Sequence, residues 1–152
     1  MRGWMAIILA GAGLVMAPAH AQVIPAPNPL LLDGKLAQCG AFPIFLAPTL
    51  DDVGYAIVDI YGPRILLNPN RMTPLSTALK LFIFAHECGH LVTGGTEDDA
   101  DCWAIQIGKQ QGWFTLANWP ALIDSLGNSP GDFSHRPGPQ RLARIAACFA
   151  AG

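Results

Sequence analysis

Residues 84–103 read FAHECGHLVTGGTEDDADCW, and this stretch decides how the rest of the chain is interpreted. It contains the pattern H-E-x-x-H, formed by His86, Glu87 and His90, at the end of a largely apolar run. Glu97 follows His90 by seven residues. Histidines four residues apart stand about 40° apart on one face of a helix, so both rings can reach one metal ion.

These residue types predict a catalytic zinc site. Such a site uses three protein ligands, usually histidine nitrogens and carboxylate oxygens, and keeps one position open. His86 and His90 supply two ligands, and Glu97 is our candidate for the third, with Asp98 in reserve. Glu87 lies beside the histidine face, where it can act as general base on a zinc-bound water whose pKa falls to about 7.

The glycine pair 94–95 predicts a tight return, so that the segment carrying Glu97 runs back along the preceding helix. Glu97 would then lie level with His90. Asp101, one turn further on, would lie near His86 or Glu87. There it could accept the free ring N–H of a ligand histidine.

Plainer interpretations stand beside these. The motif histidines can be ordinary surface residues, and Glu97 can be an acidic residue that favours a helix N-terminus. The metzincin pattern does not apply, because Thr93 and Thr96 stand where it requires glycine and histidine.

The pattern of apolar residues and breakers predicts a small α+β domain over residues 41–152. Helices are expected over 75–93, 96–111, 119–126 and 140–150. Thr73 is expected to cap the first helix, with Pro74 at its first position, and Thr96 to cap the second.

Strands are expected before the long helix. Residues 42–47 predict an edge strand because Pro43 interrupts the run, and residues 55–60 and 64–67 predict a hairpin. Residues 22–40, rich in proline, predict an extended N-terminal arm. The expected architecture is therefore a short antiparallel sheet packed on the long H-E-x-x-H helix, with further helices alongside.

The N-terminus predicts export. Arg2, the apolar segment 4–16 and the small-x-small sequence 19–21 are typical of a secretory signal peptide (residues 1–21), cleaved before Gln22. The alternative is an uncleaved membrane anchor. We expect a periplasmic or secreted protein without a stable membrane span after signal removal.

Cysteine content and charge add two expectations. The four cysteines, Cys39, Cys88, Cys102 and Cys148, predict two disulfides in an exported chain, although four buried thiols are the alternative. Three pairings are possible, and we favour Cys88 with Cys102 and Cys39 with Cys148. The net charge of −2 and the lack of a basic patch argue against a nucleic-acid partner.

The motif residues, together with Ala100 and Asp101 of E-x-x-A-D, resemble the gluzincin metallopeptidases of the CAAX-prenyl-protease and HtpX-like group. Near the C-terminus, the segment Ser134-His135-x-Pro137 and Arg141 resemble that group's Ser-His-Pro segment and its arginine. The resemblance implies a zincin-like fold and peptidase activity. It also implies that His135 stabilises the oxyanion, and that Arg141 orients the carboxylates or assists His135.

By the same resemblance, residues 64–68 would be the edge strand along which an extended substrate lies. His135 can otherwise be a plain loop histidine, and Arg141 a surface charge. Two features differ from the group: the gap between His90 and Glu97 is only six residues, and no membrane span follows the signal. We therefore expect a small soluble relative with its own substrates.

The expected function is an exported zinc metallopeptidase acting on a peptide or protein substrate. The alternative is a catalytically inactive zinc-binding interaction or assembly factor of the cell envelope. A third interpretation is a metal-free disulfide scaffold.

Overall fold

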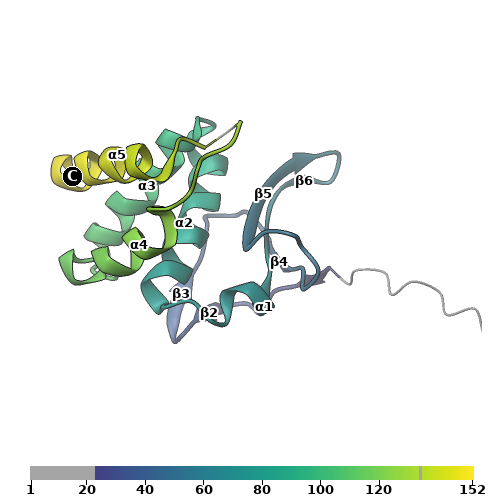
Figure 1. Cartoon of the computed structure of the whole chain (residues 1–152). Helices are drawn as coiled ribbons and strands as arrows, with labels where there is room; N and C mark the ends of the chain where they lie inside the picture. Colours follow the sequence, from purple (N-terminus) through teal and green to yellow (C-terminus); the bar gives the residue numbers. More distant parts are fainter. Residues whose placement is uncertain (1–22, 134) are drawn as a thin grey trace, which may run out of the picture.

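The computed structural model describes residues 23–133 and 135–152 and has a mixed α+β architecture. The predicted signal peptide, residues 1–21, lies outside the described residues. In Figure 1 the larger sheet lies on one side of α2 (Thr77–Thr93), and the other long helices lie on its opposite side. Among the described residues, no helix is long and apolar enough to cross a membrane.

The strands are β1 (Ile24–Pro25), β2 (Leu30–Leu32), β3 (Lys35–Ala37), β4 (Ile44–Leu46), β5 (Gly54–Asp59) and β6 (Gly62–Leu67). The helices are α1 (Pro69–Met72), α2 (Thr77–Thr93), α3 (Glu97–Gln110), the 3-10 turn η1 (Leu116–Asn118), α4 (Trp119–Leu126) and α5 (Gly138–Ala151). The expected hairpin and the expected helices after residue 96 are confirmed, with boundaries within a few residues.

The larger sheet is mixed rather than antiparallel, in the order β1-β4-β6-β5. β4 pairs parallel with β6, while the β1–β4 and β5–β6 pairs are antiparallel. The prediction of an edge strand at residues 42–47 is wrong, because β1 pairs with the outer side of β4. Pro43 precedes β4, so its missing N–H removes no hydrogen bond from the sheet.

The prediction that residues 64–68 form an edge strand is also wrong. β6 lies between β4 and β5, and its Ile65 and Leu67 have no exposed surface. A continuous apolar run is typical of such a central strand. The edge strand beside α2 is β5 instead.

Residues 22–40 are not a simple extended arm. β2 and β3 form a two-stranded hairpin whose Leu30, Leu32 and Ala37 are buried in the core. At its turn, the Asp33 carboxylate accepts hydrogen bonds from the Thr77 hydroxyl (2.9 Å) and the Lys80 ammonium (2.8 Å). The hairpin is therefore fixed to the first turn of α2.

The start predicted for the long helix is corrected. Asn68 and Pro69 already form the cap-plus-proline pattern that begins α1, and Thr73 ends that short helix. α2 begins at Thr77, where the Ser76 hydroxyl accepts from the Leu79 amide. Its end is as expected, because Gly94 adopts a left-handed conformation at φ 61° that glycine tolerates without strain.

α3 begins with the expected capping box between Thr96 and Asp99 and runs back along α2. The two helices approach closely at Gly89, where an added Cβ would lie 2.9 Å from the Cα of Ala100. This contact brings the N-terminal turn of α3 beside the C-terminal half of α2. The short gap between His90 and Glu97 is thus a tight helical hairpin.

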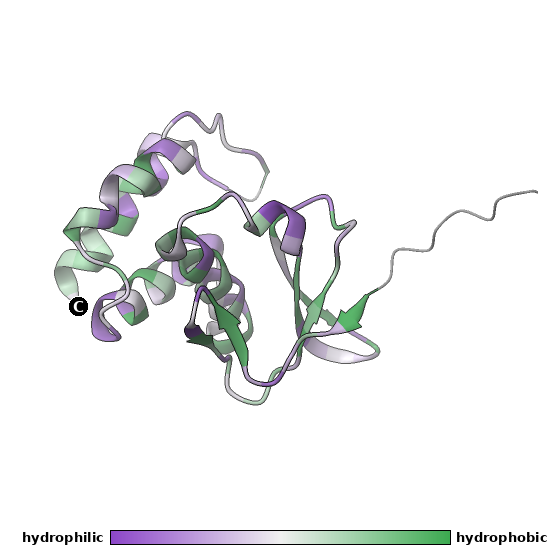
Figure 2. Cartoon of the chain, turned by 90° about the horizontal axis from the view of Figure 1, so that it is seen from below, coloured by the Kyte–Doolittle hydropathy of each residue, from purple (hydrophilic) through white to green (hydrophobic). Residues whose placement is uncertain are grey.

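Two hydrophobic clusters flank α2. One joins α2 to β2, β3 and β6, and the other joins α2 to α3, α4 and α5. Figure 2 shows hydrophobic residues along the strands and mixed stretches on the helices, as expected for helices that bury one face.

Two disulfides form, but the favoured pairing is wrong. Cys39 bonds Cys88, and Cys102 bonds Cys148. Cys88 faces the cluster that contains the β2–β3 hairpin, whereas Cys102 borders the cluster that contains α5. The two cysteines on the adjacent helices therefore point to opposite sides of the helix pair, and each reaches a different partner.

Candidate metal centre

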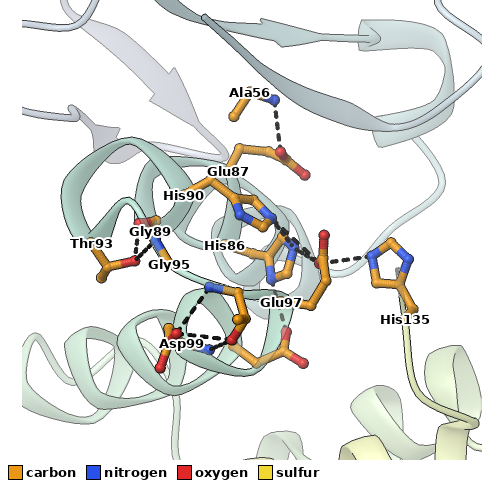
Figure 3. A network of polar contacts seen from close by, with 12 residues as sticks. Ala56, His86, Glu87, Gly89, His90, Thr93, Gly95, Glu97, Asp99 and His135 are labelled. Carbon is orange, nitrogen blue, oxygen red and sulfur yellow. Dashed lines mark hydrogen bonds and ion pairs between the residues drawn. The ribbon is translucent and has the colours of Figure 1, made fainter. Parts of the chain in front are cut away.

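The motif residues line a cleft of ≈ 610 Å³ between α2, strand β5, helix α4 and the loop of residues 127–137. α2 supplies His86, Glu87 and His90, and α3 supplies Glu97. His135 enters from the loop. Residues spread over nearly fifty positions of the chain therefore meet at one point, as Figure 3 shows.

His86 is held in one orientation. It is only 5% exposed, and its Nδ1 lies 2.8 Å from Oδ1 of Asp101. Because an ionised carboxylate can only accept, the neutral ring carries its proton on Nδ1 and directs the lone pair of Nε2 into the cleft. Asp101 in turn accepts two hydrogen bonds from Arg141, at 2.6 Å from Nε and 2.8 Å from Nη2.

Glu97 stands at the centre of three imidazole nitrogens. Its Oε2 lies 3.0 Å from Nε2 of His86, 3.4 Å from Nε2 of His90 and 2.9 Å from Nε2 of His135. The two α2 histidines bring their Nε2 atoms within 3.1 Å of each other. Yet Oε2 is buried, and no N–H of the described residues is aligned on it as a hydrogen-bond donor.

This arrangement fits a metal ion. Ligand atoms at tetrahedral zinc with bonds of about 2.0–2.1 Å lie about 3.3 Å apart. The three distances from Glu97 Oε2 to the nitrogens (2.9–3.4 Å) and the 3.1 Å between the Nε2 atoms of His86 and His90 are close to this value. A buried carboxylate oxygen without an aligned donor, lying among three imidazole nitrogens, is explained by a cation between them. His86, Glu97 and His135 form a group able to hold such an ion, and His90 adjoins it.

Charge in the site is balanced between neighbours. Burial lowers the pKa of His86, but its contacts with Asp101 and Glu97 outweigh burial and raise that pKa to about 9. Burial raises the pKa of Glu97, but His86 and His90 outweigh it and hold that pKa below its usual range. Without a metal, the histidines and Glu97 therefore retain a proton between them. A bound metal ion would replace the positive charge of that proton.

Glu87 points toward the sheet rather than toward Glu97. Its Oε2 accepts a hydrogen bond of 2.8 Å from the backbone N–H of Ala56 on β5. Burial raises the pKa of Glu87, against the opposing effect of the two α2 histidines. The carboxylate therefore lies at the junction between the candidate metal ligands and the edge strand (Figure 3).

His135 has a carboxylate partner of its own. Its Nδ1 lies 3.2 Å from both carboxylate oxygens of Asp132, whose Oδ1 also accepts its backbone N–H at 2.7 Å. The sequence interpretation missed Asp132. The only sequence feature that points to Asp132 is its position three residues before His135. The sequence does not show how the loop between them folds.

The reserve ligand Asp98 does not join the group. Both its oxygens accept from Nε of Arg136 at 3.0 Å. Of the sequence-predicted site residues, the structure brings together those on α2 and α3 with His135. It places Asp101 and Arg141 directly behind His86.

No protein-family model matches the chain, and comparisons with curated proteins and with solved structures found no match.

Proposed function

We propose that the protein is a zinc metallopeptidase that works outside the cytoplasm. The observation that carries this proposal is the buried Oε2 of Glu97, without an aligned donor, among the Nε2 atoms of three histidines. A glutamate that is not part of this group, Glu87, lines the same cleft. The two disulfides fit an oxidising compartment.

Zinc is the metal that the donor set favours. Two histidines and one carboxylate also serve non-haem iron, but that geometry leaves several positions open. Here a third imidazole lies 2.9 Å from the same carboxylate oxygen, which favours a compact four-coordinate ion. His86, His90 and Glu97 would hold the zinc ion.

A bound zinc ion would supply a Lewis acid that polarises a carbonyl and lowers the pKa of a water molecule. The protein's own contribution would come from Glu87, which accepts the proton of the attacking water and later donates it to the leaving amine. Asp101 and Arg141 would keep the His86 ring oriented through this cycle.

Strand β5 would align the substrate. The hydrogen bond from Ala56 N–H to Glu87 marks Ala56 as a residue whose backbone groups face away from β6. The backbone N–H and C=O groups of successive residues point to alternate sides of a strand, so those of Gly54 and Val58 also point away from β6. An extended peptide could pair with this edge beside the candidate metal ligands.

The rival function is a zinc-binding interaction or assembly factor without activity. Such a protein would need the metal ligands but not Glu87. Among the described contacts, Glu87 makes its hydrogen bond to Ala56 and none to the histidines or Glu97, so it does not support the metal ligands in this way. A carboxylate placed between the edge strand and the histidines favours the peptidase.

The test compares the mature protein with Glu87→Gln on a mixed peptide library, with cleavage read by mass spectrometry and zinc by elemental analysis. We expect about one zinc per chain in both, and a loss of hydrolysis of roughly 10²–10⁴-fold in the variant, the range for a general base. Asp124→Asn, on the exposed surface of α4, is the matched control and should hydrolyse normally. Zinc-loaded wild-type protein that cleaves no peptide, or a variant with full activity, would contradict the proposal.

A further inference from the structure

Backbone contacts of the described residues 127–133 and 135–137 hold His135 at the cleft. The Asp132 N–H donates to the His135 carbonyl at 3.0 Å, and the Gly138 N–H donates to the Ser129 carbonyl at 2.9 Å. Gly131 adopts φ 77°, and an added Cβ would lie within 2.8 Å of the backbone of Arg136. The position of His135 is therefore built by the backbone around it.

His135 and His86 share two kinds of contact. Each Nε2 lies close to Oε2 of Glu97, at 2.9 Å for His135 and 3.0 Å for His86. Each Nδ1 faces a carboxylate, Asp132 for His135 and Asp101 for His86. A carboxylate behind the far nitrogen is the usual support of a metal-bound histidine.

This geometry disfavours the oxyanion role that the family resemblance implies for His135. An oxyanion needs a donor, so Nε2 would have to carry a proton. With Nδ1 donating to Asp132, the neutral ring has only a lone pair at Nε2, and that lone pair faces the Glu97 oxygen. A lone pair beside a carboxylate oxygen suits a ligand to a cation.

The residue after His135 anchors it to α3. Arg136 forms an ion pair with Asp98, with Nη2 at 2.9 Å and Nε at 3.0 Å from the carboxylate. Asp98 directly follows Glu97. The histidine and the central carboxylate are thus tied together by their next neighbours in the chain.

We propose that His135 is a ligand of the metal, which completes a closed set with His86, His90 and Glu97 in the resting protein. Asp132 and Arg136 act as positioning residues for it. The inference rests on the metal site of the proposed function but not on hydrolysis. It assigns the regulation of that site: with a metal ion bound, His135 would have to move away before a substrate carbonyl could reach the same position.

The test measures zinc affinity by competition with a chromophoric chelator, and the visible spectrum of the Co²⁺-substituted mature protein. His135→Ala should lower zinc affinity at least tenfold and weaken the Co²⁺ absorption, because water replaces the lost nitrogen. Phe133→Ala, fully exposed on the same loop, should change neither. At saturating zinc, hydrolysis by His135→Ala should rise above that of the wild type, because no side chain then competes with substrate for the fourth position.

The roles of Asp132 and Arg136 are tested by the rate at which zinc is transferred from the protein to the chelator. Asp132→Asn and Arg136→Gln should speed zinc transfer to the chelator several-fold, whereas Arg71→Gln, exposed on α1, should not. Unchanged zinc affinity and Co²⁺ spectrum in His135→Ala, with hydrolysis lost, would overturn the proposal in favour of an oxyanion donor. A protein that binds zinc through His135 but cleaves no peptide would overturn only the peptidase function. A protein that binds neither Zn²⁺ nor Co²⁺ would overturn both the peptidase function and the ligand role of His135.

Discussion

Asp101 is the residue on which the orientation of the candidate site depends most. It is 1% exposed, holds the ring of His86 and accepts two hydrogen bonds from Arg141. Burial raises the pKa of Asp101, but Arg141 and His86 outweigh it and keep that pKa below its usual value. The carboxylate is thus ionised and shared between a candidate ligand and a cation.

Asp101→Asn should damage both stability and metal binding. The amide leaves the guanidinium of Arg141 without its anion, which costs about 3–5 kcal/mol for a buried pair. It also releases the His86 ring, for which a loss of about 10–100-fold in zinc affinity is expected. Urea unfolding and chelator competition measure the two effects.

Asp124→Asn, exposed on α4, is the control for Asp101→Asn. The change should leave both the free energy of unfolding and the zinc affinity close to those of the wild type. Zinc affinity of Asp101→Asn within twofold of wild type would show that His86 needs no carboxylate behind it.

The sequence predicts the residues of the site that share a helical period. His86, Glu87 and His90 follow from spacing on one helix, and Glu97 and Asp101 follow from a tight turn onto the next. Asp132 does not follow, because its contact with His135 depends on a loop closed by backbone hydrogen bonds. The donor to Glu87 is equally hidden, because it is a main-chain N–H that any residue at position 56 except proline would supply.

At the scale of elements, the packing of α3 against α2 sets the distance from Glu97 to the histidines. Gly89→Ala should separate the two helices, because the new Cβ would meet backbone atoms of Ala100 at 2.9 and 3.1 Å. Overpacking of about 1–3 kcal/mol outweighs the gain of about 1 kcal/mol in helix propensity. Thermal unfolding should show a lower Tm, and zinc affinity should fall as Glu97 moves away.

Val92→Ala tests whether an alanine substitution near the end of α2 is harmful in itself. Its side chain is 50% exposed, so both Tm and zinc affinity should stay close to those of the wild type. A Gly89→Ala variant as stable as the wild type would mean that the helices need no close approach at this point.

The sequence predicts helices better than it predicts strand order. Caps and glycines lie next to the helices that they begin or end, as Thr96 and Gly94 do. The position of β6 in the middle of the sheet depends on its parallel pairing with β4, a strand that precedes the hairpin in the chain. In the same way, β4 is not an edge strand because the two-residue strand β1 occupies its outer side. Asn68-Pro69 and Thr73-Pro74 both fit the cap-plus-proline pattern of a helix start. The local sequence does not show which of the two pairs begins a helix.

At the scale of the whole molecule, two disulfides tie the outer elements to the helix pair. Cys39–Cys88 links the β2–β3 hairpin to α2, and Cys102–Cys148 links α5 to α3. Proteolysis without reduction, followed by mass spectrometry, should yield these two linked fragments. A fragment linking Cys88 to Cys102 would contradict the fold around the metal centre.

Loss of the first disulfide should weaken the whole domain. Cys39→Ser with Cys88→Ser removes a link across 49 residues, for which a loss of about 2–5 kcal/mol is expected. The hairpin would remain attached through Asp33 and its buried leucines. Urea unfolding of the double variant and the wild type compares the two free energies of unfolding.

Zinc removal is expected to act on the global fold as well. The candidate ligands come from α2, α3 and the loop before α5, so a metal ion would bind only the folded arrangement. At zinc concentrations 100-fold above Kd, binding adds about 2.7 kcal/mol, equivalent to a Tm rise of roughly 5–15 °C. A Tm that is unaffected by a chelator would favour the metal-free scaffold.

The central claim is that one zinc ion lies among these four side chains. A crystal structure of the zinc-loaded mature protein, with anomalous data collected at the zinc edge, tests it most directly. One peak per chain is expected, at about 2.0–2.2 Å from the Nε2 atoms of His86, His90 and His135 and from an oxygen of Glu97. A cleft without a peak, or a peak held by other residues, would contradict it.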